Sequence, residues 1–317
     1  MRNSKGKGEK LKSLTGFLIL FFLFLAFADY LRNNTIFFMP EEYKTLKKIV
    51  DKIASTNDLK DREIPFTITS GGYTAYVAEE LGLCKDDGCY YFANLDPYKT
   101  HNKINGIDVN ELINQSYLLN GIEAYAWSGT TVMISQSTFQ TYGDKLDFFA
   151  CTIGHELAHI IFNDHIQQSE TLSLILENTE MDNLDNLENY LKEIGYSEII
   201  DLIKKGLSFD ELKERIELYL SRESESIADN HGARMVINSG FDPLTCLEEL
   251  TFLTSTAYYP TDTELDDTHP GYIERYKSLE EFVNEYTQSD DIRSYKPFKW
   301  KWIYNRRLNT LIFKPVN

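Results

Sequence analysis

Basic residues are scarce in this chain, and their scarcity limits what the protein can bind. The 317 residues include 49 acidic side chains but only 32 lysines and arginines, which gives a formal net charge of −17. Binding to nucleic-acid phosphates needs clustered lysines and arginines. We therefore expect no nucleic-acid partner.

Cysteines are also few, and four in a chain of this length exclude a disulfide scaffold. Cys84 and Cys89 flank a turn-forming segment. In an oxidising compartment they could close a small disulfide loop, and two free thiols are an equally good interpretation. Cys151 and Cys246 lie in apolar stretches, where we expect buried small hydrophobic residues rather than metal ligands.

Long hydrophobic runs are absent after residue 28. Before it, a basic stretch precedes residues 14–28, which carry no charge and end in Ala26-Phe27-Ala28. Fifteen residues are fewer than the ~20 that span a bilayer, and a small-x-small ending is typical of signal-peptidase sites. We predict a signal peptide over residues 1–28, with an uncleaved anchor as the alternative. Either one implies export, to the periplasm or the extracellular face of the membrane.

The hydrophobic pattern predicts a mainly helical α+β fold with one domain over residues 40–290. Helices are expected after Pro40, from Leu146 to about Phe162, and through the acidic residues 166–225. Short strands are predicted at residues 64–69, 90–93, 123–127 and 130–135.

The C-terminal tail, residues 291–317, differs in composition. Residues 292–317 carry seven bases and no acid, and their apolar pattern predicts a β-hairpin of residues 299–304 and 308–313. Such a hairpin could contact a membrane surface or an envelope-protein partner. Packing on the acidic domain of the same chain is the interpretation we favour.

The strongest chemical signal is His155-Glu156-Leu157-Ala158-His159. On a helix, residues i and i+4 lie on one face, so the two imidazoles can occupy two corners of a tetrahedral zinc site. Glu156, beside the first histidine, can then reach a water on the metal and act as general base.

A catalytic zinc needs a third protein ligand, and two candidates exist. His165 would follow the metzincin spacing, but Phe162 stands where that spacing requires a glycine turn. Glu225 and Asp229 also share a helix face, so Glu225 could bind the metal while Asp229 orients a ligand histidine. Taken alone, these two are better interpreted as solvent-facing acids in an acidic segment.

Three segments in order resemble the zinc metallopeptidase family of HtpX, the CAAX prenyl protease and BepA. The family shows HExxH, then ExxADxxGA, then a late HPxxxxR, and the resemblance covers about Pro40 to Leu279. The resemblance implies a zincin-like fold and one zinc per chain, held by His155, His159 and Glu225. It also implies supporting roles for Asp229 and Arg275. In this chain the segments read His155-Glu156-Leu157-Ala158-His159, Glu225-Ser226-Ile227-Ala228-Asp229-Asn230-His231-Gly232-Ala233 and His269-Pro270-Gly271-Tyr272-Ile273-Glu274-Arg275.

The cleft departs from the family pattern. Residues 71–120 look like an insertion, and Glu123-Ala124-Tyr125-Ala126 replaces the usual Asn-Ala-x-Ala. We expect Thr131, Val132 and Met133 to form an exposed edge strand that pairs with an extended substrate.

The resemblance implies an exported metalloendopeptidase acting on polypeptides, with unfolded or misassembled envelope proteins as substrates. The alternative is a non-catalytic, chaperone-like protein that keeps a structural zinc, although the intact Glu156 argues against it. His269 could donate a hydrogen bond to the oxyanion, or cover the fourth position of the zinc and block it. It could also merely cap the next helix. We favour the blocking role, because the preceding loop is acidic and should be solvated.

Overall fold

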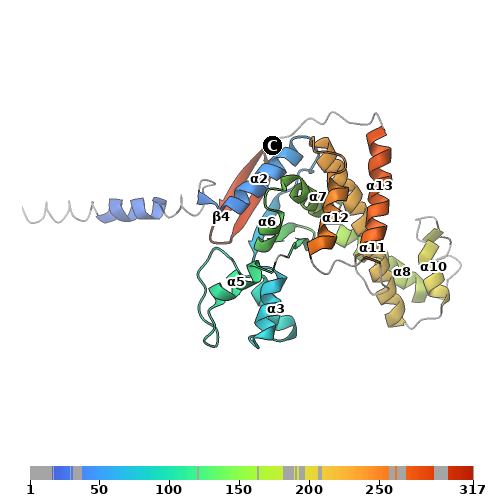
Figure 1. Cartoon of the computed structure of the whole chain (residues 1–317), viewed down its shortest axis with the longest axis horizontal. Helices are drawn as coiled ribbons and strands as arrows, with labels where there is room; N and C mark the ends of the chain where they lie inside the picture. The colour runs from blue at the N-terminus through green and yellow to red at the C-terminus, as the bar shows by residue number, and fades with distance from the viewer. Residues whose placement is uncertain are drawn as a thin grey trace, which may run out of the picture.

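The computed structural model shows a mixed β-sheet packed against long helices (Figure 1). This agrees with the mainly helical α+β class predicted from the sequence. The structure describes residues 16, 18–28, 30, 38–119, 121–162, 164–180, 189, 191–192, 197–205, 209–256, 261–262, 269–288 and 299–316.

The described sheet has five strands in the order β2-β3-β1-β5-β4. Only β1 and β3 run parallel to each other; the other neighbouring strands are antiparallel. The strands are β1 (Ile64–Thr69), β2 (Ala124–Trp127), β3 (Thr131–Ser135), β4 (Lys299–Asn305) and β5 (Thr310–Val316).

This order corrects the prediction of the edge strand. β3, which contains Thr131, Val132 and Met133, lies between β2 and β1 and pairs with both. Its backbone is therefore already hydrogen-bonded on both sides, and Thr131–Met133 are not an exposed edge. The edge on this side of the sheet is β2. The error arose because both segments have strand-like patterns, and a local pattern does not say which strand is outermost.

The C-terminal hairpin completes the sheet. β5 pairs with β1, matching Phe66 with Leu311, and β4 pairs with β5. The indole Nε1–H groups of Trp300 and Trp302 each donate to Asp51 Oδ1 at 2.7 Å. Asp51 lies on α2 (Glu41–Ala54), so the hairpin packs on the acidic body of its own chain. The boundary predicted at residues 290/291 lies outside the described residues.

Two long helices cross each other at a pair of glycines. α7 runs from Leu146 to Phe162, as the sequence predicts, and α11 spans Phe209–Asn238. A Cβ on Gly154 would lie 2.9 Å from the carbonyl oxygen of Gly232, and a Cβ on Gly232 would lie 2.7 Å from the backbone nitrogen of His155. Neither backbone could accommodate a side chain at this crossing. The close approach brings the middle of α11 against the HExxH segment.

A disulfide ties α7 to a third helix. Cys151 on α7 is bonded to Cys246 on α12 (Thr245–Thr256), and both are buried. Both are buried, as the sequence predicts, but the sequence did not predict the bond between them. They are 95 residues apart in the sequence, which is why no local signal indicated the pair. α13 (Tyr272–Gln288) packs beside α11 and α12.

The segment at residues 71–120 forms a small helical unit with its own apolar cluster. It contains α3 (Gly72–Glu80), a 3₁₀ turn (Asp86–Cys89), α4 (Tyr90–Ala93) and α5 (Val109–Tyr117). The Cys84–Cys89 disulfide forms, one of the two alternatives for that pair. Residues 90–93 are helical, so the predicted strand is wrong. Four residues are too few to distinguish the two periodicities, and Phe92 is buried against helices.

The predicted acidic helices are present where the chain is described. α8 (Asp164–Glu180), α10 (Ser197–Lys204) and the first half of α11 share a second apolar cluster that includes Ile175, Ile199 and Ile216. The short α6 (Gln136–Tyr142) joins β3 to α7. Residues 18–28 are helical, and their large apolar side chains are exposed. Among the described residues no helix has both the length and the apolar character needed to cross a membrane.

Candidate metal centre

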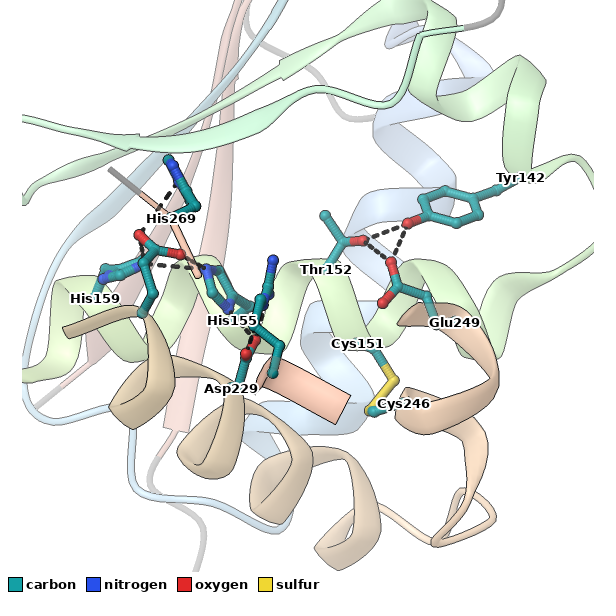
Figure 2. Close-up of polar contacts among 11 residues, drawn as sticks. Tyr142, Cys151, Thr152, His155, His159, Asp229, Cys246, Glu249 and His269 are labelled. Carbon is teal, nitrogen blue, oxygen red and sulfur yellow. Dashed lines mark hydrogen bonds and ion pairs between the residues drawn. A yellow bond between two sulfur atoms is a disulfide. The ribbon is translucent and has the colours of Figure 1, made fainter. Parts of the chain in front are cut away.

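Two imidazoles face each other on α7. His155 and His159 lie one helical turn apart, and their Nε2 atoms are separated by 3.1 Å (Figure 2). Only 15% of the His155 side chain and 12% of the His159 side chain are exposed, while the apolar residues of the helix pack into the main core. The two ring nitrogens are therefore held close together at a position lined by protein.

Glu225 on α11 supplies a carboxylate to the same position. Its Oε2 lies 3.2 Å from His155 Nε2, and its Oε1 lies 3.4 Å from His159 Nε2. Ligands at about 2.0–2.1 Å from a tetrahedral zinc are about 3.3 Å apart, so all three separations fit one ion. Glu225 Oε2 is also buried and accepts no hydrogen bond in the described part of the chain. The donor set therefore fits zinc with three protein ligands.

A second carboxylate and an arginine stand behind the ligands. Asp229 Oδ1 accepts a hydrogen bond from His155 Nδ1 at 2.9 Å, which leaves the Nε2 lone pair facing the metal position. Arg275 on α13 donates from Nε to Asp229 Oδ2 at 2.7 Å and from Nη2 to Oδ1 at 2.5 Å. Asp229 and Arg275 are both about nine-tenths buried. This pair fixes the orientation of the first histidine.

The charges of the centre depend on one another. Burial alone would lower the pKa of His155, but its contacts with Asp229 and Glu225 raise that pKa well above the usual value. Burial alone would raise the pKa of Glu225, but its contacts with His155 and His159 hold it well below the usual value. A buried carboxylate thus stays ionised where it faces the two rings, as a metal ligand must.

Glu156 lies next to the ligands but is not one of them. Its side chain is 6% exposed and lines the cavities on either side of the centre. Burial raises the pKa of its carboxyl above the usual value, although the two histidines partly oppose this. A carboxyl group that both accepts and returns a proton benefits from such a shift.

His269 enters from the loop before α13. Its Nε2 lies 3.4 Å from Glu225 Oε1, and its side chain is 60% exposed. Figure 2 shows the ring above the two histidines of α7. The three ligand atoms of His155, His159 and Glu225 lie within 4.8 Å of one another, and this group does not include His269. His165 falls within α8, and its side chain is outside the described residues.

A cleft runs past the centre, between helices α7 and α11 and the edge strand β2. One cavity of about 230 Å³ is lined by Ala124–Ala126, by the ligand residues and by Ser221 and Ser224. A second cavity of about 390 Å³ continues along α7 to Thr152 and to Glu249 on α12. The metal ligands lie where these two cavities meet.

The sequence model of Peptidase family M48 matches residues 101–283, more than half of the chain and the whole centre. The chain belongs to Peptidase family M48. No curated protein and no solved structure matches it. Membership confirms the family resemblance read from the three motifs, the zinc metallopeptidase activity, and zinc as the cofactor at His155, His159 and Glu225.

Sequence reasoning missed part of this M48 cleft. It did not identify β2 as the edge strand, and it did not single out Glu249. The one available signal for Glu249 was its position next to Leu250 in the segment that forms α12. The neighbouring Glu248 is exposed. The cleft residue Thr152 lies three positions before His155, on the same helix.

Proposed function

We propose that this M48 peptidase cleaves extended segments of unfolded or misassembled proteins outside the cytoplasm. The observation that carries the proposal is the position of β2 in the cleft. β2 has a sheet neighbour, β3, on one side only within the described residues, and its residues Ala124–Ala126 line the cavity beside His155 and Glu156. An extended peptide can add to such an edge and bring a backbone carbonyl to the metal centre.

The residues around the centre each have a separate role in peptide hydrolysis. When bound, zinc supplies Lewis acidity toward a carbonyl oxygen and toward water. Glu156 accepts a proton from the attacking water and returns it to the leaving amine. Asp229 holds His155 in the tautomer that binds metal, and Arg275 keeps Asp229 ionised.

We assign His269 the role of stabilising the oxyanion. The cleft walls remove part of its water and lower its pKa below the usual value, which keeps the ring neutral. A neutral ring can donate an N–H hydrogen bond to an oxygen that develops negative charge. Its position outside the three-ligand group supports this role over the blocking role favoured from the sequence.

Exposed aromatic side chains beside β2 support an unfolded substrate. Trp127, at the end of β2, is 47% exposed and contacts the ring of Tyr90, which is 46% exposed. Tyr76 and Tyr91 on the neighbouring helices are also exposed. Apolar side chains that a folded protein would bury can pack on such a surface.

Two disulfides support export. Cys84–Cys89 and Cys151–Cys246 account for all four cysteines, and disulfides persist mainly in oxidising compartments. The basic and then apolar residues 1–28 supply a route to such a compartment. A signal peptide cut after Ala28 would leave Asp29 as the first residue, which N-terminal sequencing of the exported protein would detect.

Substitution of Glu156 by Gln tests the proposed hydrolysis. The variant should keep its zinc and its fold but lose turnover by about 10²–10⁴-fold or more, because it lacks the base and retains the ligands. The assay is mass spectrometry of fragments from a reduced, denatured protein, with zinc content measured in parallel. Glu280→Gln, an exposed acid on α13, is the matched control.

Wild-type turnover in Glu156→Gln would refute the role of Glu156. A wild-type protein that binds zinc and denatured protein but releases no fragments would instead support the non-catalytic alternative.

A further inference from the structure

One buried acid lines the cleft without belonging to the metal centre. Glu249, on α12, is 5% exposed and lines the same 390 Å³ cavity as His155, Glu156 and Glu225. Figure 2 shows its carboxylate beside Tyr142 and Thr152, further along α7 from the two histidines. The cavity therefore has the metal ligands in one part and a carboxylate in another.

Within the described residues, one oxygen of this carboxylate accepts hydrogen bonds and the other does not. Thr152 Oγ1 donates to Glu249 Oε1 at 3.1 Å, and the Tyr142 hydroxyl donates to the same oxygen. Oε2 accepts no hydrogen bond from the described part of the chain. Burial raises the pKa of Glu249 to about 7, and these two hydrogen bonds offset it only in part. Ionising a carboxyl group that is this poorly solvated costs free energy unless a hydrogen-bonding or cationic partner binds to it.

Part of the cavity wall suits a long aliphatic stem. Leu250 and Leu253 extend from the same helix as Glu249, and Ile122 and the Cys151–Cys246 disulfide contribute further apolar surface. The nearest arginine is committed elsewhere, because Arg275 donates two hydrogen bonds to Asp229. No lysine lines the cavity in the described residues.

We propose that Glu249 makes this cavity a specificity pocket for lysine or arginine at a substrate residue next to the scissile bond. The proposal rests on the proposed peptidase function. An apolar stem packs along the leucines, and the cationic head forms a charge-assisted hydrogen bond with Oε2. An acidic substrate side chain would place two carboxylates together. An aliphatic one would fill the pocket but leave Oε2 without a partner, so the pocket discriminates against both.

The test compares matched peptides that differ at one residue. Fluorogenic peptides carry lysine, norleucine or glutamate at either residue flanking the cleaved bond, and kcat/KM is measured for wild type, Glu249→Gln and Glu248→Gln. Glu248 is the neighbouring, exposed acid and serves as the control. At one of the two positions, wild type and Glu248→Gln should prefer lysine over norleucine by at least about tenfold. Glu249→Gln should lose this preference through slower cleavage of the lysine peptide, with the norleucine peptide unimpaired.

An equal lysine-to-norleucine ratio in wild type and Glu249→Gln would overturn the proposal, and so would a wild-type preference for norleucine. A purely structural role would slow all peptides alike and leave the ratio unchanged. If Glu249→Gln fails to fold, Leu253→Lys provides the second variant. It leaves Glu249 and its two hydrogen bonds in place, brings a cation into the cavity, and should abolish the lysine preference.

A binding measurement separates this proposal from the proposed function. Zinc-loaded Glu156→Gln is titrated calorimetrically with hydroxamates of lysine and norleucine peptides, with and without the Glu249→Gln change. Tighter binding of the lysine compound that depends on Glu249 supports the pocket even if no peptide is cleaved, in which case only the proposed function fails. Equal binding of the two compounds, together with normal cleavage of peptides, overturns the pocket alone.

Discussion

Asp229→Asn tests how strongly the hydrogen bonds of Asp229 with His155 and Arg275 control zinc binding. Asp229 accepts from His155 Nδ1 at 2.9 Å and from Arg275 at 2.5 and 2.7 Å. Asparagine has nearly the same shape but no charge. Its amide can present N–H to His155 Nδ1, which then becomes the acceptor and leaves the hydrogen on Nε2, where the metal binds.

Two magnitudes follow. Loss of a group that orients a ligand histidine weakens metal binding by about 10–100-fold, or about 1.4–2.7 kcal/mol. For the zinc-free protein, the Asp229 pKa is lowered from 3.8 to about 2, which corresponds to roughly 2 kcal/mol of stability. This contribution is present above pH 3.8 and is lost as the pH falls through 2. The substitution should cost more, about 3–5 kcal/mol, because it also leaves the buried Arg275 without its anionic partner.

The assay has two parts. A competing chromogenic chelator gives the zinc dissociation constant, and urea unfolding with a strong chelator present gives the free energy of unfolding of the zinc-free protein. Asp210→Asn is the control, because Asp210 is exposed in the first turn of the same helix, α11. A zinc dissociation constant within threefold of wild type would refute the orienting role. An unchanged free energy of unfolding would refute the loss of stability assigned to the unpaired Arg275.

Three further outcomes are expected. Glu225→Ala should lose zinc while His165→Ala keeps it, as metal analysis of the purified variants would show; the reverse result would overturn the ligand assignment. His269→Ala at equal zinc content should lose about 10²–10³-fold in turnover, and a rise in activity would instead identify a blocking histidine. The Glu249 pKa is raised from 4.5 to about 7, so its effect on stability is most favourable below pH 4.5 and is lost as the pH rises through 7. Glu249→Gln should therefore remove roughly 3 kcal/mol of pH dependence across that window, measured by urea unfolding of the zinc-free protein at pH 5 and pH 8; parallel pH profiles for the two proteins would contradict this.

The features that the sequence predicted correctly are those set by local geometry. The spacing of His155 and His159 places both rings on one face of any helix that contains them, and Glu225 and Asp229 share a face for the same reason. The apolar pattern from Leu146 to about Phe162 predicts α7, which spans Leu146–Phe162. The alternating residues after Lys299 predict the hairpin. Each of these features depends on residues that lie within a few positions of one another, so the order of residues in the sequence is enough to predict it.

The tertiary structure decided which distant elements meet. Glu225 becomes a ligand because Gly154 and Gly232 let α7 and α11 touch backbone to backbone. β2 rather than β3 is the edge because β1 pairs with β3 on its other side. The Cys151–Cys246 bond and the pairing of Glu249 with Thr152 both join α7 to α12 across more than ninety residues. A hydrophobic period repeats along one element and is the same whatever that element packs against, so sequence periodicity could not distinguish these arrangements from their alternatives.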